Sequence, residues 1–233
     1  MARFSLESQA AARLHHSDIV PVYAVGHDHG VYYYIMQLIE QVPFRFPEEP
    51  NEVARIGECV ARALHCAHPE GVIHRDIKPS NRILDRQRKV WVADFGLARL
   101  QREEHQTASG SIVGTMRYMS SEQACGSSRW VDHRADIYAL GVSLYEMLTG
   151  RCPYDAFDRI LFLAELERGE PIGLRQLNGT IPVDLETIVL KAMASHPDDR
   201  YLTAEALAED LHRFVAGEVI QARRPSWQDR LAK

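Results

Sequence analysis

The segment "GVIHRDIKPSNRIL", residues 71–84, decides how this sequence is interpreted. It places Asp76, Lys78 and Asn81 in a polar stretch between two short apolar runs. An aspartate in a tight polar loop can accept a proton from a hydroxyl nucleophile. A lysine two residues later can neutralise phosphate charge, and the asparagine amide offers an oxygen ligand to a hard cation such as Mg²⁺.

A second candidate oxygen ligand, Asp94, comes thirteen residues after Asn81 in "DFG", residues 94–96. An aspartate followed closely by a glycine can swing in and hold a metal ion on a phosphate chain. Together with Asp76 and Lys78, these ligands indicate a phosphoryl-transfer site, where positioning and electrostatics provide most of the catalysis.

The composition is that of a globular protein and narrows the choice of partners and compartments. The 233 residues are 45% hydrophobic and 25% charged, and the net charge is −5, which does not favour nucleic acid as a partner. We find no run of 18 apolar residues and therefore expect no membrane span within this chain. The four cysteines form no C-x-x-C pair, so we expect a reducing, cytoplasmic location.

The N-terminal third is expected to form a small β-containing layer. The apolar spacing predicts an amphipathic helix over 3–15, and β-branched and tyrosine residues predict strands over 19–25 and 31–39 with "HDHG" as their turn. Three prolines mark 41–50 as a loop. Helical spacing resumes over 51–67, so the chain is expected to be α+β.

The remainder is expected to be mainly helical. The stretch 135–150 is apolar on nearly every face, which predicts a helix buried in the core, and Gly150 is a plausible stop. Further helices are expected over 157–168, 183–195 and 203–216, with Asp184 and Thr203 as N-terminal caps.

"HRDIKPSN" (74–81) followed by "DFG" resembles the catalytic and metal-binding loops of eukaryotic-type protein kinases. "GTMRYMSSE" (114–122) and "DIYALGV" (136–142) follow in the order of that family, and the resemblance extends from about residue 3 to about residue 216. The tail "FVAGEVIQARRPS" resembles bacterial serine/threonine kinases of the membrane-linked type. The family implies a kinase-like fold, divided here into a partial N-lobe (1–40), a mainly helical C-lobe (41–216) and a basic polar tail (217–233).

The resemblance implies that the cofactors are ATP and Mg²⁺ and that the substrates are Ser/Thr hydroxyls of proteins. It makes Asp76 the base that orients the substrate hydroxyl and Lys78 the contact to the γ-phosphate. It makes Asn81 and Asp94 the ligands of Mg²⁺. Lys78 together with Thr115 matches the serine/threonine pattern of the family and not the tyrosine pattern.

The resemblance also assigns the nucleotide pocket. Glu7 falls where the regulatory helix of the family carries its ion-pairing glutamate, although an isolated helical glutamate is more often a solvated charge. Met36 falls at the gatekeeper position. Gln37 to Ile39 fall at the hinge, whose backbone would meet adenine.

Further resemblances concern regulation and scaffolding. Arg75 is expected to pair with a phosphate on the activation loop, or else to be a solvated loop residue. Thr107 and Ser109 are candidate phosphosites, and self-association would allow trans-autophosphorylation. Glu122 and Arg200 are expected to form a buried structural ion pair. Asp136 is expected to anchor the loop backbone of the two residues that precede Asp76.

Two features of the family are missing from residues 1–233. No G-x-G-x-x-G occurs, and no lysine precedes Lys78, so the strand that carries the ATP-anchoring lysine is absent. We therefore expect little or no kinase activity from this chain alone, because displacing reacting atoms by about 1 Å can cost on the order of 100-fold in rate. The apolar faces that hold Val20, Val22, Tyr32 and Tyr34 are expected to lack a partner layer.

Two hypotheses follow from these observations. In the first, the chain is part of an active kinase that has been truncated, which the intact catalytic loop favours. In the second, it is a non-catalytic, kinase-like (pseudokinase) scaffold, which the missing lysine and glycine-rich loop favour.

Overall fold

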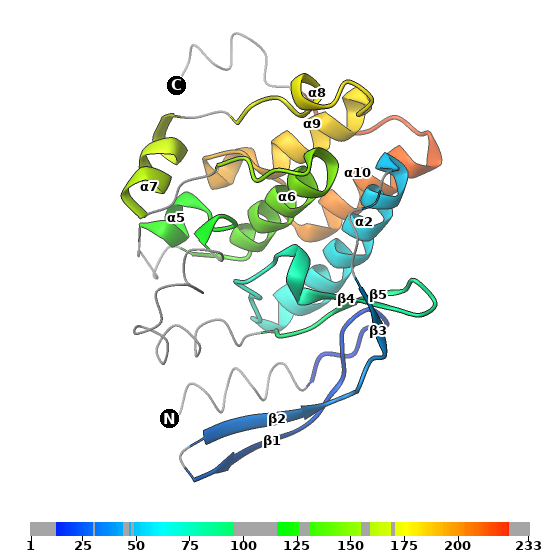
Figure 1. The fold of residues 1–233 in the computed structure, drawn as a ribbon, viewed down its shortest axis with the longest axis vertical. Coiled ribbons are helices and arrows are strands. Elements are labelled where there is room, and N and C mark those ends of the chain that lie inside the picture. The colour runs from blue at the N-terminus through cyan, green and yellow to red at the C-terminus, as the bar shows by residue number, and fades with distance from the viewer. Residues whose placement is uncertain are drawn as a thin grey trace.

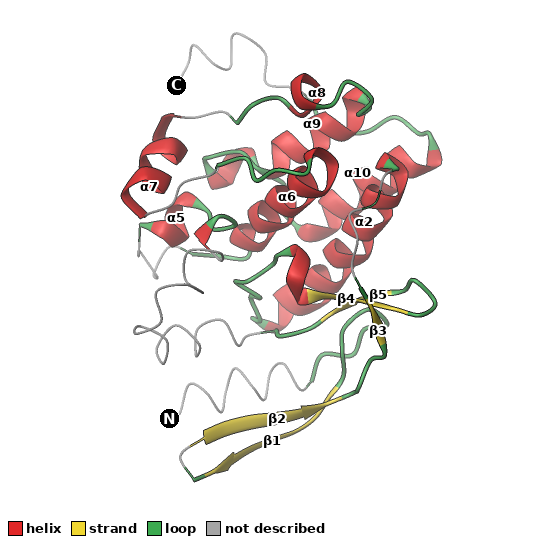
Figure 2. Cartoon of the chain, in the orientation of Figure 1, coloured by secondary structure: helices red, strands yellow, loops and turns green. Residues whose placement is uncertain are grey.

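The computed structural model describes residues 13–29, 31–43, 47, 49–95, 116–125, 131–154, 159–168 and 171–223. A two-stranded hairpin projects from one end of a mainly helical body, with a small second sheet at the junction (Figures 1 and 2). Most of the helix expected over 3–15 lies outside the described residues, and the described end of that range, residues 13–15, is not helical.

The hairpin consists of β1 (Val22–Asp28) and β2 (Val31–Met36), which pair antiparallel. Their β-branched and tyrosine residues favour the extended backbone. Val25 lies opposite Tyr34 and Gly26 lies opposite Tyr33, so partners in the register share a face. The turn begins at His29, whose φ of 49° is left-handed.

The strand boundaries expected from the sequence were wrong at three ends. The first strand runs over 22–28 and not 19–25, and the second ends at Met36 and not at residue 39. Pro21 lacks an N–H and cannot donate to a ladder, and its carbonyl instead accepts a hydrogen bond from Gln37 N at 2.9 Å. Val20 N donates to Val92 O at 3.0 Å, so residues 19 and 20 join the second sheet.

The strongly exposed apolar side chains differ from the expected set, of which the Tyr32 side chain lies outside the part that the structure describes. Val20 is 4% exposed and therefore has a partner layer, contrary to the expectation. Tyr23, Tyr33 and Ile35 are 66%, 46% and 53% exposed. Tyr33 and Ile35 lie on one face of the strand and Tyr34 on the other, where Val25, its partner in the register, is 37% exposed. Both faces of the hairpin therefore carry exposed apolar side chains.

The second sheet contains three short strands in the order β3-β4-β5. They are β3 (Gln41–Val42), β4 (Arg82–Asp85) and β5 (Val90–Val92). The sequence pattern predicted only a loop at 41–50, because two residues are too few to show an alternating pattern. Asp94 comes two residues after the end of β5, so this sheet positions it.

The helical body follows the predicted order. Its α-helices are α2 (Pro50–Ala67), α5 (Ser121–Ala124), α6 (Arg134–Thr149), α7 (Arg159–Arg168), α8 (Leu174–Leu177), α9 (Val183–Ala192) and α10 (Ala204–Ala216), and its 3-10 turns are η1 (His68–Glu70), η2 (Pro79–Asn81) and η3 (Pro197–Asp199). The single-turn helices α5 and α8 were not predicted, since one turn shows no period. No helix within the described ranges combines the length and the hydropathy needed to cross a membrane.

The core is centred on α6, which is buried along nearly its whole length, as predicted. It packs against α2 on one side and α9 on another. A Cβ at Gly141 would lie 2.8 Å from Met193 Cγ and 3.0 Å from Ala192 Cβ, so this glycine allows α6 and α9 to approach closely. The body thereby forms a rigid support for the loop that follows α2.

The helix ends agree with the sequence at two of three expected positions. The Thr203 hydroxyl accepts a hydrogen bond from Ala206 N at 3.1 Å and caps α10, and Gly150 ends α6 with φ 70°. Asp184 is not a cap, because α9 begins two residues earlier than that cap requires and Pro182 occupies the capping position.

Gly150→Ala is expected to destabilise the fold by about 1–2 kcal/mol, because a left-handed backbone is costly for a residue with a Cβ. A Cβ there would meet no atom within 4 Å, so the cost comes from the backbone alone. Urea unfolding monitored by circular dichroism measures it. Gly179→Ala is the control: it has the same open surroundings without the left-handed φ, and we expect a change within about 0.5 kcal/mol. Equal effects would contradict the backbone explanation.

Candidate active site

The loop that carries Asp76 leaves the end of α2 through the η1 turn and Gly71, whose φ is 75°. Val72 and Ile77 are buried and fix the loop to the body. The loop then enters η2 and continues directly into β4. The polar residues of this loop are therefore held between α2 and the sheet that contains β4.

Asp136, at the start of α6, anchors this loop as predicted. Its carboxylate is fully buried and accepts hydrogen bonds from His74 N at 2.8 Å and Arg75 N at 2.7 Å. The His68 ring lies 3.0 Å from the same carboxylate. Arg75 has a left-handed φ of 65°, a conformation that these bonds help to maintain.

The side chains of Lys78 and Asn81 both contact the carboxylate of Asp76. Lys78 Nζ lies 2.8 Å from Asp76 Oδ2, and Asn81 Nδ2 donates to both Asp76 Oδ2 and Asp76 O at 2.8 Å. Because the Asn81 nitrogen makes both of these bonds, the amide oxygen remains available to a cation. Lys78 and Asn81, which follow Asp76 by two and five residues, thus form one cluster with it.

The other oxygen of this carboxylate, Asp76 Oδ1, is buried and has no hydrogen-bond partner among the described residues. A buried acceptor without a donor is unfavourable unless a ligand supplies one. A substrate hydroxyl is a donor of the required kind. The Asp76 Oδ1 atom can therefore accept a hydrogen bond from a ligand hydroxyl.

Asp94 is held next to this cluster by the residue that precedes it. Ala93 N donates to Asn81 O at 3.4 Å, and Ala93 O lies 2.8 Å from His74 Nε2. The His74 ring also packs on Phe95, with the ring centroids 4.7 Å apart. Asp94 itself has a left-handed φ of 65°. The two segments that carry the candidate metal ligands are thus joined directly, and their carbonyl and carboxylate chemistry fits Mg²⁺.

Tyr34 is a residue at this site that the sequence analysis did not identify. Its hydroxyl donates to Asp94 Oδ1 at 2.8 Å across a separation of 60 residues. Burial, and then the hydrogen bond to Asp94 and its charge, raise the pKa of the Tyr34 hydroxyl, which therefore remains a donor. No local signal could have found this contact, because strand alternation gives the face of Tyr34 but not its partner.

The other candidate residues are placed as follows. Met36 ends β2 and is half-buried, Gln37 follows it with its N–H bonded to Pro21 O, and Ile39 is half-buried. Four further candidates lie outside the described residues: Glu7, Thr107, Ser109 and Thr115.

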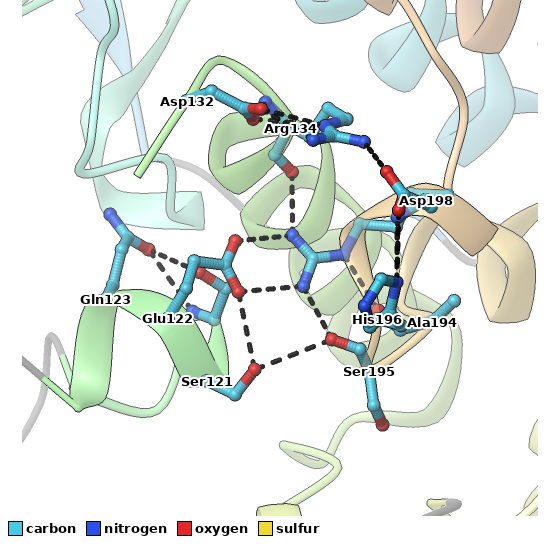
Figure 3. Close-up of polar contacts among 11 residues, drawn as sticks. Ser121, Glu122, Gln123, Asp132, Arg134, Ala194, Ser195, His196 and Asp198 are labelled. Carbon is cyan, nitrogen blue, oxygen red and sulfur yellow. Dashed lines mark hydrogen bonds and ion pairs between the residues drawn. The ribbon is translucent and has the colours of Figure 1, made fainter. Parts of the chain in front are cut away.

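The expected ion pair between Glu122 and Arg200 is present, with the Arg200 side chain 0% exposed and the Glu122 side chain 13% exposed. Figure 3 shows Glu122 among the neighbouring polar residues. Arg200 donates from Nη1 to Glu122 Oε1 at 2.7 Å and from Nη2 to Oε2 at 3.0 Å. Burial opposes ionisation of Glu122, but the hydrogen bonds and charge of Arg200 outweigh it, and the pKa of Glu122 lies below its usual value. Arg200 also donates to the carbonyls of Ala194, Ser195 and Arg134. Together with its bonds to Glu122, these bonds join three segments of the helical body.

A family model described as a protein kinase domain matches residues 2–212. The chain therefore belongs to the protein kinase family. This confirms the kinase-like α+β fold, with a small β-containing part and a mainly α-helical part.

Three curated relatives illustrate the similarity. Serine/threonine-protein kinase PrkC of Bacillus subtilis is 33% identical over 233 residues, which covers 97% of this chain and 36% of PrkC. Serine/threonine-protein kinase PknB of Mycobacterium leprae is 36% identical over 231 residues, which covers 94% of this chain and 37% of PknB. Tyrosine-protein kinase MasK of Myxococcus xanthus is 40% identical over 231 residues, which covers 91% of this chain and 35% of MasK. The chain thus spans about a third of the length of these relatives.

Proposed function

We propose that this chain carries the transfer site of an ATP-dependent protein kinase that phosphorylates Ser/Thr hydroxyls of proteins. The observation that carries the proposal is the cluster in which Lys78 and Asn81 both contact one oxygen of Asp76 while its other oxygen is buried without a partner. Such a cluster suits a hydroxyl nucleophile and a phosphate chain in close proximity.

The proposed roles follow from the chemistry of each group. Asp76 Oδ1 accepts the hydrogen bond of the substrate hydroxyl and orients it. Lys78 neutralises charge on the γ-phosphate, and Asn81 and Asp94 hold Mg²⁺ through their side-chain oxygens. The bound Mg²⁺·ATP supplies the phosphoryl group and the cation that offsets its charge.

Preference for Ser/Thr over Tyr rests on Lys78 and Thr115, which match the serine/threonine pattern. Two of the three relatives above are named as serine/threonine kinases and one as a tyrosine kinase. Phosphoamino-acid analysis of a generic substrate distinguishes the two specificities.

The nucleotide pocket and its regulation are extensions of this proposal. Met36 acts as gatekeeper, Gln37 to Ile39 form the hinge, and Glu7 belongs to the regulatory helix. Arg75 binds a phosphate placed on Thr107 or Ser109 by a second copy of the protein. We further propose that the protein is the cytoplasmic part of a membrane-linked kinase. The division at residues 40 and 216 remains a prediction.

The alternative is a non-catalytic kinase-like scaffold, which the lack of any lysine before Lys78 favours. The DNA upstream of the Met1 codon separates the two hypotheses. An active parent kinase requires an in-frame glycine-rich loop and a V-A-x-K-like strand there. A stop codon close upstream supports the scaffold.

Asp94→Asn is expected to weaken Mn²⁺-dependent binding of a non-hydrolysable ATP analogue by about 10- to 100-fold, because a neutral amide is a poorer ligand than a carboxylate. Isothermal titration of residues 1–233, with Mn²⁺ as the probe for Mg²⁺, measures this affinity. Asp28→Asn, on the exposed hairpin tip, is the matched control and is expected to bind as the wild type does. Nucleotide binding that does not depend on the metal or on Asp94 would refute the proposed site.

A further inference from the structure

A hydrogen bond links the hairpin to the candidate metal ligand. The Tyr34 hydroxyl lies 2.8 Å from Asp94 Oδ1, and both side chains are partly buried. Among the described residues, Tyr34 is the only side chain that hydrogen bonds to this carboxylate, and Asp94 Oδ2 has no such partner. One oxygen is therefore held and the other remains for a ligand.

The geometry of this bond is fixed by backbone contacts between the two segments. Val20 N donates to Val92 O at 3.0 Å and Val92 N donates to Asp18 O at 2.8 Å, which attaches the base of β1 to β5. Gln37 N donates to Pro21 O at 2.9 Å and attaches the end of β2 to the same base. The strand that carries Tyr34 and the segment that carries Asp94 are thus parts of one hydrogen-bonded unit.

The donor has the properties that suit a metal ligand. A bond from a hydroxyl to a carboxylate is charge-assisted and stronger than a bond between neutral groups. The phenol is neutral, so it orients the carboxylate without competing with a cation for the negative charge. Among the described residues, the hydrogen bond that reaches the Asp94 carboxylate from the hairpin comes from this hydroxyl.

We propose that Tyr34 is a positioning residue that orients the Asp94 carboxylate for binding of the Mg²⁺·triphosphate group. This inference rests on the proposed function, since it assumes that Asp94 is a metal ligand. Groups that orient a metal ligand typically contribute 10- to 100-fold to metal affinity. The competing explanation is that the bond only attaches the hairpin to the body, in which case the affinity for metal would not depend on it.

Tyr34→Phe tests the proposal, since it removes the hydroxyl and keeps the ring. We expect Mn²⁺-dependent binding of the ATP analogue to residues 1–233 to weaken by about tenfold in isothermal titration. Tyr33→Phe is the matched control: this neighbour is half-exposed and lies over Gly26, and the variant is expected to bind as the wild type does. Thermal unfolding of both variants verifies that they are folded.

A double-mutant cycle separates the possible outcomes. If Tyr34 acts through Asp94, then Tyr34→Phe has no further effect on metal affinity in an Asp94→Asn background. Binding that depends on Asp94 but is unchanged or strengthened in Tyr34→Phe would overturn this inference and leave the proposed function intact. Binding that does not depend on Asp94 would overturn both. Equal tenfold losses in the two backgrounds would also overturn the inference, because the effect would not pass through Asp94.

Discussion

Replacing Asp76 with asparagine is expected to lower phosphotransfer by about 10²- to 10⁴-fold, the usual contribution of a positioned acid or base. Asp76 Oδ1 is the buried acceptor without a partner, and an asparagine there cannot accept a proton from the substrate hydroxyl. Lys78 and Asn81 would also lose the negative oxygen that both contact. The measurement is kcat for a generic Ser/Thr peptide with Mg²⁺ and ATP, in a protein extended to include the glycine-rich loop and the lysine-bearing strand.

The control for this experiment is Asp184→Asn, which removes an exposed carboxylate in the first turn of α9 far from the loop in sequence. It is expected to leave kcat unchanged. Unchanged activity in Asp76→Asn would remove Asp76 from the mechanism. Residues 1–233 alone are expected to show little or no turnover, and robust activity of that chain would contradict our view that the lysine-bearing strand is required.

Arg200→Ala is expected to lower the free energy of unfolding by about 3–5 kcal/mol, the usual cost of breaking a buried ion pair. The Arg200 side chain is 0% exposed, so its removal leaves the partly buried charge of Glu122 without its partner. Three backbone carbonyls lose their donor as well. Since a typical domain is stable by only about 5–15 kcal/mol, the loss is visible in guanidinium unfolding.

Arg62→Ala provides the control, because Arg62 pairs with Glu58 on the exposed face of α2. Exposed pairs one helical turn apart contribute only about 0.3–0.5 kcal/mol.

The pH dependence of the free energy of unfolding gives a second readout. The folded-state pKa of Glu122 is lowered, so its stabilisation is present above the ordinary glutamate pKa of 4.5 and disappears as the pH falls through the folded-state pKa. This pH-dependent contribution should be absent from Arg200→Ala. If Arg200→Ala lowers the free energy of unfolding by less than about 1 kcal/mol, the structural role of the pair is contradicted.

Much of the fold was accessible from the sequence where the signal was periodic and long. The buried helix α6 was predicted because its residues are apolar on nearly every face, and α10 was predicted together with its Thr203 cap. The two-residue strand β3 and the single-turn helices α5 and α8 were missed, because a segment of about one period shows no repeat. The first strand was misplaced because Val20 is as β-prone as its neighbours, and only the lack of an N–H at Pro21 shifts the pairing.

The candidate site likewise has one part that the sequence indicates and one part that only the tertiary structure shows. The sequence by itself determined that Asp76, Lys78 and Asn81 lie within one short loop, where residues two and five apart can come close, and the structure shows that they do. Only the tertiary structure decided that Tyr34 meets Asp94, because this contact depends on how residues 18–21 attach the hairpin to β5. Spacing along the chain governs local contacts, whereas contacts between segments 60 residues apart depend on packing and backbone pairing that no periodicity specifies.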